Sequence, residues 1–262
     1  MRALVVALAL AGAAGCSKAD LSDFAYVNSL RILGAQAEPP EAAPGDTVAL
    51  SAWVFDPHGR SIDVRWSACM LPSNGVANAA CADGSGNGLV ALGSGETLSI
   101  VVPAVDAAML GPPDITGGVY LPLFIHASGN GDAVDAVYRL RIAGSQPRNK
   151  NPMFASIEPL RDDGLPEVGI AGNVWGLIAH YLNGVESYET PASAPDTVFE
   201  RLTTQWFATA GSFPDQPVGG TAVQAFTLDR ALPPSGGTID LWVVGHDERG
   251  GSAMLHRSFV MQ

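Results

Sequence analysis

The chain has 262 residues, of which 26 are Asp or Glu and 14 are Lys or Arg, and its formal net charge is −12 at pH 7. A surface this acidic repels phosphate backbones, so nucleic acid is excluded as an expected partner. Lys18 and Lys150 are the two lysines of the sequence, which leaves covalent catalysis by a lysine amine almost no residue to use. The 30 glycines and 19 prolines are spread along the chain and favour short strands joined by turns over long helices.

Residues 1–15 have the layout of a secretory signal peptide. Arg2 supplies a positive charge, and the apolar run that follows is too short to span a bilayer, which needs about 20 apolar residues. Small residues at 13–15 directly precede Cys16, and this pattern resembles a bacterial lipobox. The resemblance implies alkylation of the Cys16 thiol by diacylglycerol, cleavage before Cys16, and acylation of its new amino group, with palmitate among the chains. An ordinary signal peptide cut elsewhere is the alternative.

Residues 16–27 are expected to be the lipidated cysteine and a tether. In bacterial lipoproteins an Asp directly after the lipidated cysteine favours the inner membrane, and this chain has Ser17, so the resemblance implies the outer membrane. Whether the protein faces the periplasm or the cell surface is left open.

The three cysteines are an odd number, and assigning Cys16 to lipid leaves Cys69 and Cys81 as a pair. In an oxidising periplasm these two can close a short disulfide loop, which stabilises a folded chain by roughly 3 kcal/mol in the chain-entropy model. Neither cysteine has a second ligand at the spacing of a zinc site, so a metal site is not expected there.

Residues 28–143 contain six or seven segments with the pattern of strands. Apolar and other residues alternate in TVALSAWVF (47–55), the turn DPHGRS (56–61) reverses the chain, and IDVRW (62–66) alternates again, which predicts a β-hairpin. This number of strands joined by turns is typical of one β-sandwich of immunoglobulin size. Further strands are expected at 28–37, 96–103, 119–127 and 134–143.

Residues 144–152, GSQPRNKNP, contain no large apolar side chain apart from proline, and we interpret them as an interdomain linker. Residues 153–262 then repeat the first half in outline, with Trp206 in the place of Trp66. The second copy carries an insertion at 183–197, between its second and third strands. The predicted fold class is therefore all-β, with two tandem immunoglobulin-like β-sandwiches after a lipoprotein signal peptide.

The hairpin of the first half also carries a family resemblance. Asp56, Pro57, Gly59 and Trp66 resemble the D-P-x-G turn and the following strand tryptophan of bacterial immunoglobulin-like, PKD-like and cadherin-like extracellular modules. A PKD domain would continue W-x-F-G-D-G, and this chain has WSACMLP. The resemblance implies an architecture, and no activity, because such lipoproteins usually have no characterised function.

The sequence offers little for catalysis. The G-x-S-x-G motif of a nucleophile elbow does not occur, and the five histidines do not have the H-x-H, H-x3-H or H-E-x-x-H spacing of metal sites. We therefore expect that this protein is not an enzyme.

Calcium is the cofactor that the sequence leaves open. Asp83, Ser85 and Asn87 occupy positions one, three and five of an EF-hand-type loop, but position twelve is Ser94 in place of the bidentate Glu. The alternative is a plain glycine-rich turn. Without this calcium no cofactor is expected.

Trp53 is the candidate for a ligand-binding face. It lies on the opposite face of its strand from the apolar residues, so it is either on the surface, where it could stack on a glycan, or covered by another part of the protein.

These observations predict a membrane-anchored envelope lipoprotein that acts as a non-catalytic binding or scaffolding module. A glycan-binding accessory module or a component of a degradative enzyme system is one alternative, and a purely structural spacer is another. The membrane is the expected partner through the lipid anchor, and a protein or a glycan is left open as the second.

If Cys69 and Cys81 are bridged, reduction lowers the melting temperature, because the cross-link no longer restricts the unfolded chain. Thermal denaturation with and without a reductant measures this effect, and we expect a fall of several degrees. An unchanged melting temperature, together with two thiols that react with iodoacetamide before reduction, would contradict the bridge.

Overall fold

The computed structural model describes residues 24–69, 88–104, 110–114, 116–143, 148–159, 168–169, 174–183, 186–189, 197–213, 223–229, 231–234 and 236–261. The regular elements of these residues are β-strands, so the chain is all-β as predicted. Within the same residues no helix is long and apolar enough to cross a membrane.

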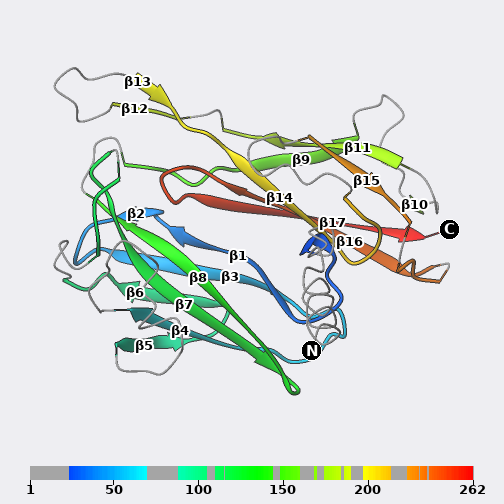
Figure 1. Cartoon of the computed structure of the whole chain (residues 1–262), viewed down its shortest axis with the longest axis horizontal. Helices are drawn as coiled ribbons and strands as arrows, with labels where there is room; N and C mark the ends of the chain where they lie inside the picture. The colour runs from blue at the N-terminus through cyan, green and yellow to red at the C-terminus, as the bar shows by residue number, and fades with distance from the viewer. Residues whose placement is uncertain are drawn as a thin grey trace, which may run out of the picture.

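In the first half, two sheets enclose a common core (Figure 1). One has the order β1-β3-β6 and the other the order β2-β8-β7-β4-β5. The predicted strands at 47–55 and 119–127 are present, and β2 and β5 were not predicted. The predicted β-hairpin of 47–55 and 62–66 is wrong, because β3 and β4 belong to different sheets and the turn between them crosses from one sheet to the other. The strands of this first sandwich are β1 (Arg31–Glu38), β2 (Glu41–Ala42), β3 (Thr47–Phe55), β4 (Asp63–Cys69), β5 (Leu89–Ser94), β6 (Thr97–Val101), β7 (Val119–Gly129) and β8 (Asp132–Ile142).

The second half repeats this arrangement. Its sheets have the orders β9-β11-β15 and β10-β17-β16-β14, and β12 and β13 form a separate two-stranded sheet. β12 lies within the predicted insertion at 183–197, and β13 begins at its last residue. The strands of this second sandwich are β9 (Phe154–Pro159), β10 (Val168–Gly169), β11 (Val174–Tyr181), β12 (Ser187–Glu189), β13 (Thr197–Phe199), β14 (Thr203–Ala208), β15 (Val223–Thr227), β16 (Thr238–His246) and β17 (Ser252–Met261).

The pairing confirms the predicted repeat. In each half, a short edge strand pairs in parallel with the last strand of that half. These pairs are β2 with β8 and β10 with β17. The tryptophans predicted to correspond, Trp66 on β4 and Trp206 on β14, are both 1% exposed in the cores of their sandwiches. The fold class is thus two tandem immunoglobulin-like β-sandwiches.

A separate apolar cluster lies between the two sandwiches. A β-bulge in β1 between Ile32 and Gly34 interrupts the pairing with β3 at Leu33, and Leu33 is buried in this cluster. The rings of Phe55 and Trp242 meet there with centroids 4.5 Å apart. We call this set the interdomain apolar cluster: Val27, Leu33, Phe207, Trp242 and Val244, with Trp53, Phe55 and Met254 packed against it.

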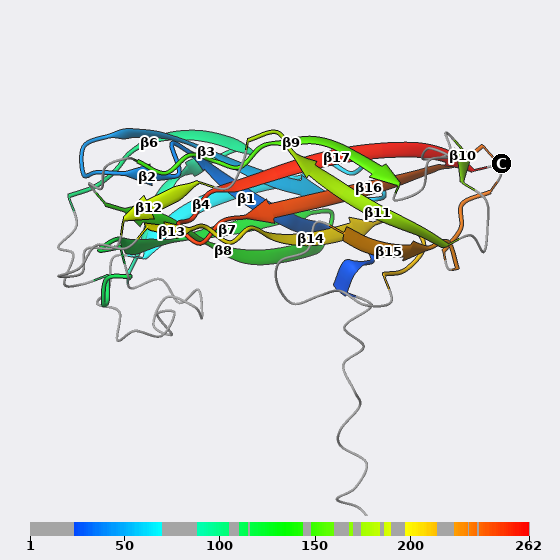
Figure 2. The same ribbon diagram turned by 90° about the horizontal axis from the view of Figure 1, so that it is seen from above.

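The second sandwich therefore lies beside the first, with β16 and β17 next to β1 and β3 (Figure 1). Seen from above, strands of both sandwiches run roughly along the long axis of an elongated molecule (Figure 2). The end of the predicted tether also belongs to this assembly, because Tyr26 pairs with Ala208 and Ala25 is 1% exposed in the second core.

Gly34 sets how closely the two sandwiches approach. A Cβ atom at this position would lie 2.9 Å from Cε3 of Trp53 and 3.2 Å from Cγ1 of Val244. We expect Gly34→Val to push the sandwiches apart and to lower the free energy of unfolding by about 1–3 kcal/mol, as overpacking does elsewhere.

Urea denaturation measures this loss, with Ser99→Val, at an exposed position of β6, as the matched control. Equal stabilities of the two variants would show that the approach at Gly34 carries no energetic weight.

Candidate functional site

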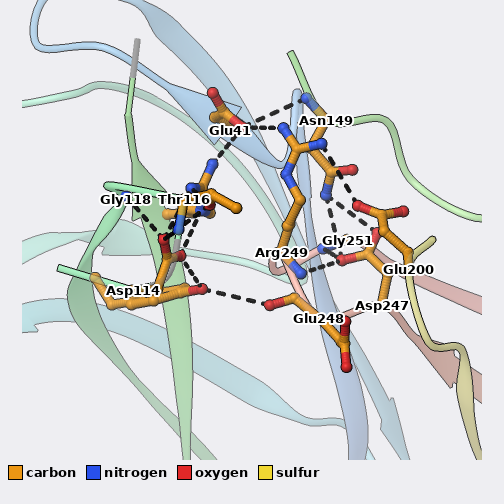
Figure 3. Close-up of polar contacts among 12 residues, drawn as sticks. Glu41, Asp114, Thr116, Gly118, Asn149, Glu200, Asp247, Glu248, Arg249 and Gly251 are labelled. Atoms are coloured by element: carbon orange, nitrogen blue, oxygen red, sulfur yellow. Dashed lines mark hydrogen bonds and ion pairs between the residues drawn. The ribbon is translucent and has the colours of Figure 1, made fainter. Parts of the chain in front are cut away.

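A turn of the second sandwich docks on the first. This turn joins β16 to β17 and contains Asp247, Glu248 and Arg249, with Gly250 and Gly251. It meets the linker and strands β2 and β8, and Figure 3 shows the polar contacts made there. We call this set of residues the charged joint: Glu41, Asp114, Thr116, Arg141, Asn149, Glu200, Asp247 and Arg249.

Glu41 lies at the centre of the charged joint and is 0% exposed. Its Oε2 atom accepts hydrogen bonds from Arg141 of the first sandwich (NH1, 2.5 Å) and from Arg249 of the second (NH2, 2.8 Å). The backbone N–H of Asn149, in the linker, also points at this atom at 3.4 Å. One carboxylate oxygen thus joins three parts of the chain.

Arg141, also 0% exposed, is held by groups of its own sandwich. Its Nε and NH2 atoms donate to the two carboxylate oxygens of Asp114, at 2.9 and 3.2 Å, and NH2 also donates to the hydroxyl of Thr116. A Cβ atom at position 118 would collide with the guanidinium group, so only glycine fits there. Gly118, directly before β7, therefore makes room for a buried cation.

Asp247 closes the β16–β17 turn and binds the linker through hydrogen bonds. Its Oδ1 atom accepts hydrogen bonds from the backbone N–H groups of Arg249 and Gly251, at 2.8 and 2.7 Å. The side-chain amide of Asn149 donates to both of its oxygens, at 3.2 and 3.1 Å. The turn and the linker therefore form one hydrogen-bonded unit.

Arg249 connects this unit to the β12–β13 insertion. Its guanidinium lies 3.5 Å from a carboxylate oxygen of Glu200 and 5.4 Å from the ring centre of Tyr188. The side chains of Arg249 and Glu200 are 3% and 2% exposed, so this ion pair is shielded from water.

Neutral hydrogen bonds extend the docking along the linker. The Asn151 side chain donates to the carbonyl of Ala37 at 2.7 Å and accepts from the N–H of Ser252 at 2.9 Å. Gln36 donates to the carbonyl of Ser252, and the Tyr138 hydroxyl donates to the carbonyl of Gly250. The sequence predicts a linker at 144–152 from its polarity. In the described residues, 148–152, its two buried asparagines, Asn149 and Asn151, hold it in place by hydrogen bonds.

The environment shifts the pKa values of the carboxyl groups in opposite directions. Burial alone would raise the pKa of Asp114, but the hydrogen bonds from Arg141, Thr116, Tyr120 and the N–H of Gly118 outweigh it and hold this pKa far below its usual value. Burial, followed by the negative charge of Asp247, raises the pKa of Glu200 to about 8. Asp114 is therefore ionised at neutral pH, and Glu200 is mostly protonated.

A groove lies beside the charged joint, with a volume of about 460 Å³. Asp114 and Thr116 of the first sandwich line one part of it, and Tyr188, Phe199 and Arg201 of the second line another. Phe199 is 68% exposed, although it is aromatic. The groove therefore offers an exposed aromatic ring next to charged groups of both signs, which suits a protein surface more than a small apolar ligand.

Most residues singled out from the sequence lie outside this joint. Cys16, Cys81, Asp83, Ser85 and Asn87 fall outside the described residues, so the lipid anchor, the calcium loop and the partner of Cys69 stay predictions. Cys69 ends β4 and is 1% exposed. Within the described ranges, no group of three or more His, Cys, Asp or Glu residues is placed to hold a metal ion.

The structure places Trp53 in the interdomain apolar cluster, packed against residues of the second sandwich. Trp53 is half-buried there, so another part of the protein covers some of its surface. A ligand-binding role of Trp53 stays a prediction.

His256 on β17 lies near an aspartate and a serine, the residue types of a serine-protease triad, but their arrangement differs from that of a triad. Asp240 and Ser258 both lie near Nε2 of His256, at 2.8 and 3.3 Å. A catalytic relay needs the carboxylate and the hydroxyl at opposite nitrogens of the ring. This cluster is a set of mutual surface hydrogen bonds.

Replacing Arg249 tests how much the charged joint contributes. In Arg249→Met the carboxylate of Glu41 stays buried with one of its two guanidinium partners lost, and we expect the free energy of unfolding to fall by about 3–5 kcal/mol. Arg201→Met is the control: its side chain is 86% exposed and lies 3.8 Å from Glu248, and such surface pairs contribute at most about 1 kcal/mol. Guanidinium denaturation of both variants measures the difference, and a stable Arg249→Met protein would contradict this role.

No family model matches the chain, and no curated protein matches it. Among solved structures it is similar to Drosophila N-cadherin EC1-4, at 11% identity, over 87% of this chain and 49% of that one, with a TM-score of 0.24. It is also similar to the three N-terminal domains of the highly immunogenic outer capsid protein of bacteriophage RB49, at 12% identity, over 89% of this chain and 59% of that one, with a TM-score of 0.22. The chain thus spans about half of each of these structures, and likenesses at such TM-scores carry no conclusion about its function.

Proposed function

We propose that this protein is a bacterial envelope lipoprotein, anchored to the outer membrane through Cys16, and that its two sandwiches act as one rigid, non-catalytic binding or scaffolding unit. The observation that carries the proposal is the sharing of the Glu41 carboxylate between Arg141 and Arg249, one from each sandwich. Neighbouring domains of one chain usually move relative to each other unless their interface is large or strongly fixed. Here a buried ion-pair network and an apolar cluster fix it.

A rigid pair of modules holds two distant surfaces at a constant separation, which is useful to a scaffold and unnecessary for a flexible tether. The groove beside the charged joint is the proposed contact surface, because it combines residues of both sandwiches with the exposed ring of Phe199. Its residues keep their mutual positions only while the joint is intact. Binding and rigidity are therefore linked in this proposal.

No specific observation favours the glycan-binding alternative, since Trp53 packs between the sandwiches. The purely structural spacer has the same rigid joint and differs only in having no partner at the groove. An experiment on the groove in the anchored protein separates these two functions.

A photo-crosslinking amino acid in place of Phe199 tests the proposal in cells. We expect a discrete crosslinked adduct and recovery of the protein with the membrane fraction, because the anchor places the groove next to its partner. The same amino acid at Val260, which is 46% exposed on β17, is the matched control and should give no discrete adduct. With Cys16→Ala added, we expect the protein to leave the membrane fraction.

Membrane retention of the Cys16→Ala protein would refute the anchor. Identical patterns from the two crosslinker positions would refute the groove and favour the spacer. Protease treatment of intact cells, with a periplasmic protein as the seal control, then decides whether the sandwiches face the cell surface.

A further inference from the structure

We propose that the charged joint is a proton-controlled lock, which is closed while the carboxyl group of Glu200 carries a proton and opens when this group ionises. The proposal goes beyond the scaffolding role and depends on neither the lipid anchor nor the partner. It rests on where Glu200 lies, on which charges face it, and on what its contacts hold together.

Glu200 lies between β13 and β14 and is 5% exposed. Its backbone N–H donates to the carbonyl of Glu186 at 2.9 Å, which fixes the residue at the base of the insertion. Oε1 of Glu200 and Oδ1 of Asn149 are both buried, and neither has a hydrogen-bond partner among the described residues. An ionised carboxylate only accepts hydrogen bonds, whereas a protonated one can donate. A proton on Glu200 therefore lets this buried carboxyl group donate a hydrogen bond as well as accept one.

The charges around Glu200 also favour its protonated form. Asp247, Glu186 and Glu248 act on it as negative charges, and Arg249 acts as the positive one. Further into the joint, Glu41 and Asp114 face the guanidinium of Arg141. With Glu200 ionised, three carboxylates of the joint (Glu41, Asp114 and Glu200) form ion pairs with the two buried guanidinium groups, and Asp247 also interacts electrostatically with Arg249. Protonation of Glu200 removes one of these negative charges.

Ionisation of Glu200 acts on the joint because its neighbours are the residues that dock the second sandwich. Arg249 binds Glu41 across the interface, and Asp247 binds Asn149 of the linker. Water can hydrate an ionised Glu200 only if this covering shell moves. Arg249 attracts the ionised form, but burial and the neighbouring carboxylates oppose it and raise the pKa of Glu200.

The sign of the pH dependence follows from linkage. The pKa of Glu200 is raised from an ordinary value near 4.5 to about 8, so the closed protein binds this proton more tightly than the open one. Between these two pH values the closed state is progressively destabilised as the pH rises. Burial lowers the pKa of His246, and burial together with Asp247 raises that of Tyr181 to about 12, so neither neighbour changes charge between pH 7 and 9.

Tryptic cleavage of the linker in the purified full chain measures opening. Arg148 and Lys150 are exposed, but the peptide bonds after them lead to Asn149 and Asn151, which are 2% and 8% exposed. Cleavage there requires the joint to open, and its rate follows the population of the open form. Dividing by the cleavage rate of a peptide with the linker sequence removes the pH dependence of trypsin itself.

We expect the normalised rate to rise about tenfold from pH 7 to pH 9, because the ionised fraction of a group with a pKa of about 8 rises by that factor. Glu200→Gln, which is neutral at every pH, should be cleaved at the slow rate throughout. Glu158→Gln, at an exposed position of β9, is the matched control and should behave like the natural chain.

A flat profile for the natural chain, or the same rise in Glu200→Gln, would overturn the proposal. A second readout needs no variant: carboxyl-carbon NMR of glutamate-labelled protein should show one glutamate that titrates near pH 8. If every glutamate carboxyl titrates below pH 6, the lock is refuted even where the Gln variant does not fold.

Discussion

The arrangement of the two sandwiches depends on the burial of one carboxylate, that of Glu41. A carboxylate removed from water must find partners that replace its hydration, and the first sandwich supplies one guanidinium, that of Arg141. The second partner is Arg249, which belongs to the other sandwich. Each sandwich therefore completes the solvation of the other, and separating them exposes both sides of an unfinished ion-pair network.

Apolar packing supplies the second half of this constraint, and its geometry follows from small features of β1. The bulge at Leu33 interrupts the alternation, and Gly34 leaves space for the ring of Trp53. The apolar cluster brings the sheets together without specifying their orientation, because hydrophobic contact is not directional. The ion pairs of Glu41 and the hydrogen bonds of Asn149 and Asn151 are directional, and they fix one orientation.

The fold could be predicted from the sequence because it depends on local patterns. The alternation in 47–55 and the correspondence of Trp66 with Trp206 placed strands and cores correctly. The charged joint could not be predicted, because Glu41 and Arg249 are 208 residues apart and read locally as solvated residues near turns. Trp53 shows the same limit: its strand face was correct, but what covers that face depends on the other sandwich.

The pKa values of Asp114 and Glu200 are shifted in opposite directions, and the positions of the guanidinium groups contribute to this difference. Arg141 meets Asp114 with two parallel hydrogen bonds, so Asp114 stays charged at a position that is partly open to water. Arg249 directs a hydrogen bond to Glu41 across the interface and reaches Glu200 only at 3.5 Å. Docking therefore directs this cation to Glu41 of the neighbouring sandwich, and Glu200 receives only the longer contact. Burial in the docked joint, followed by the negative charge of Asp247, then favours a proton on Glu200.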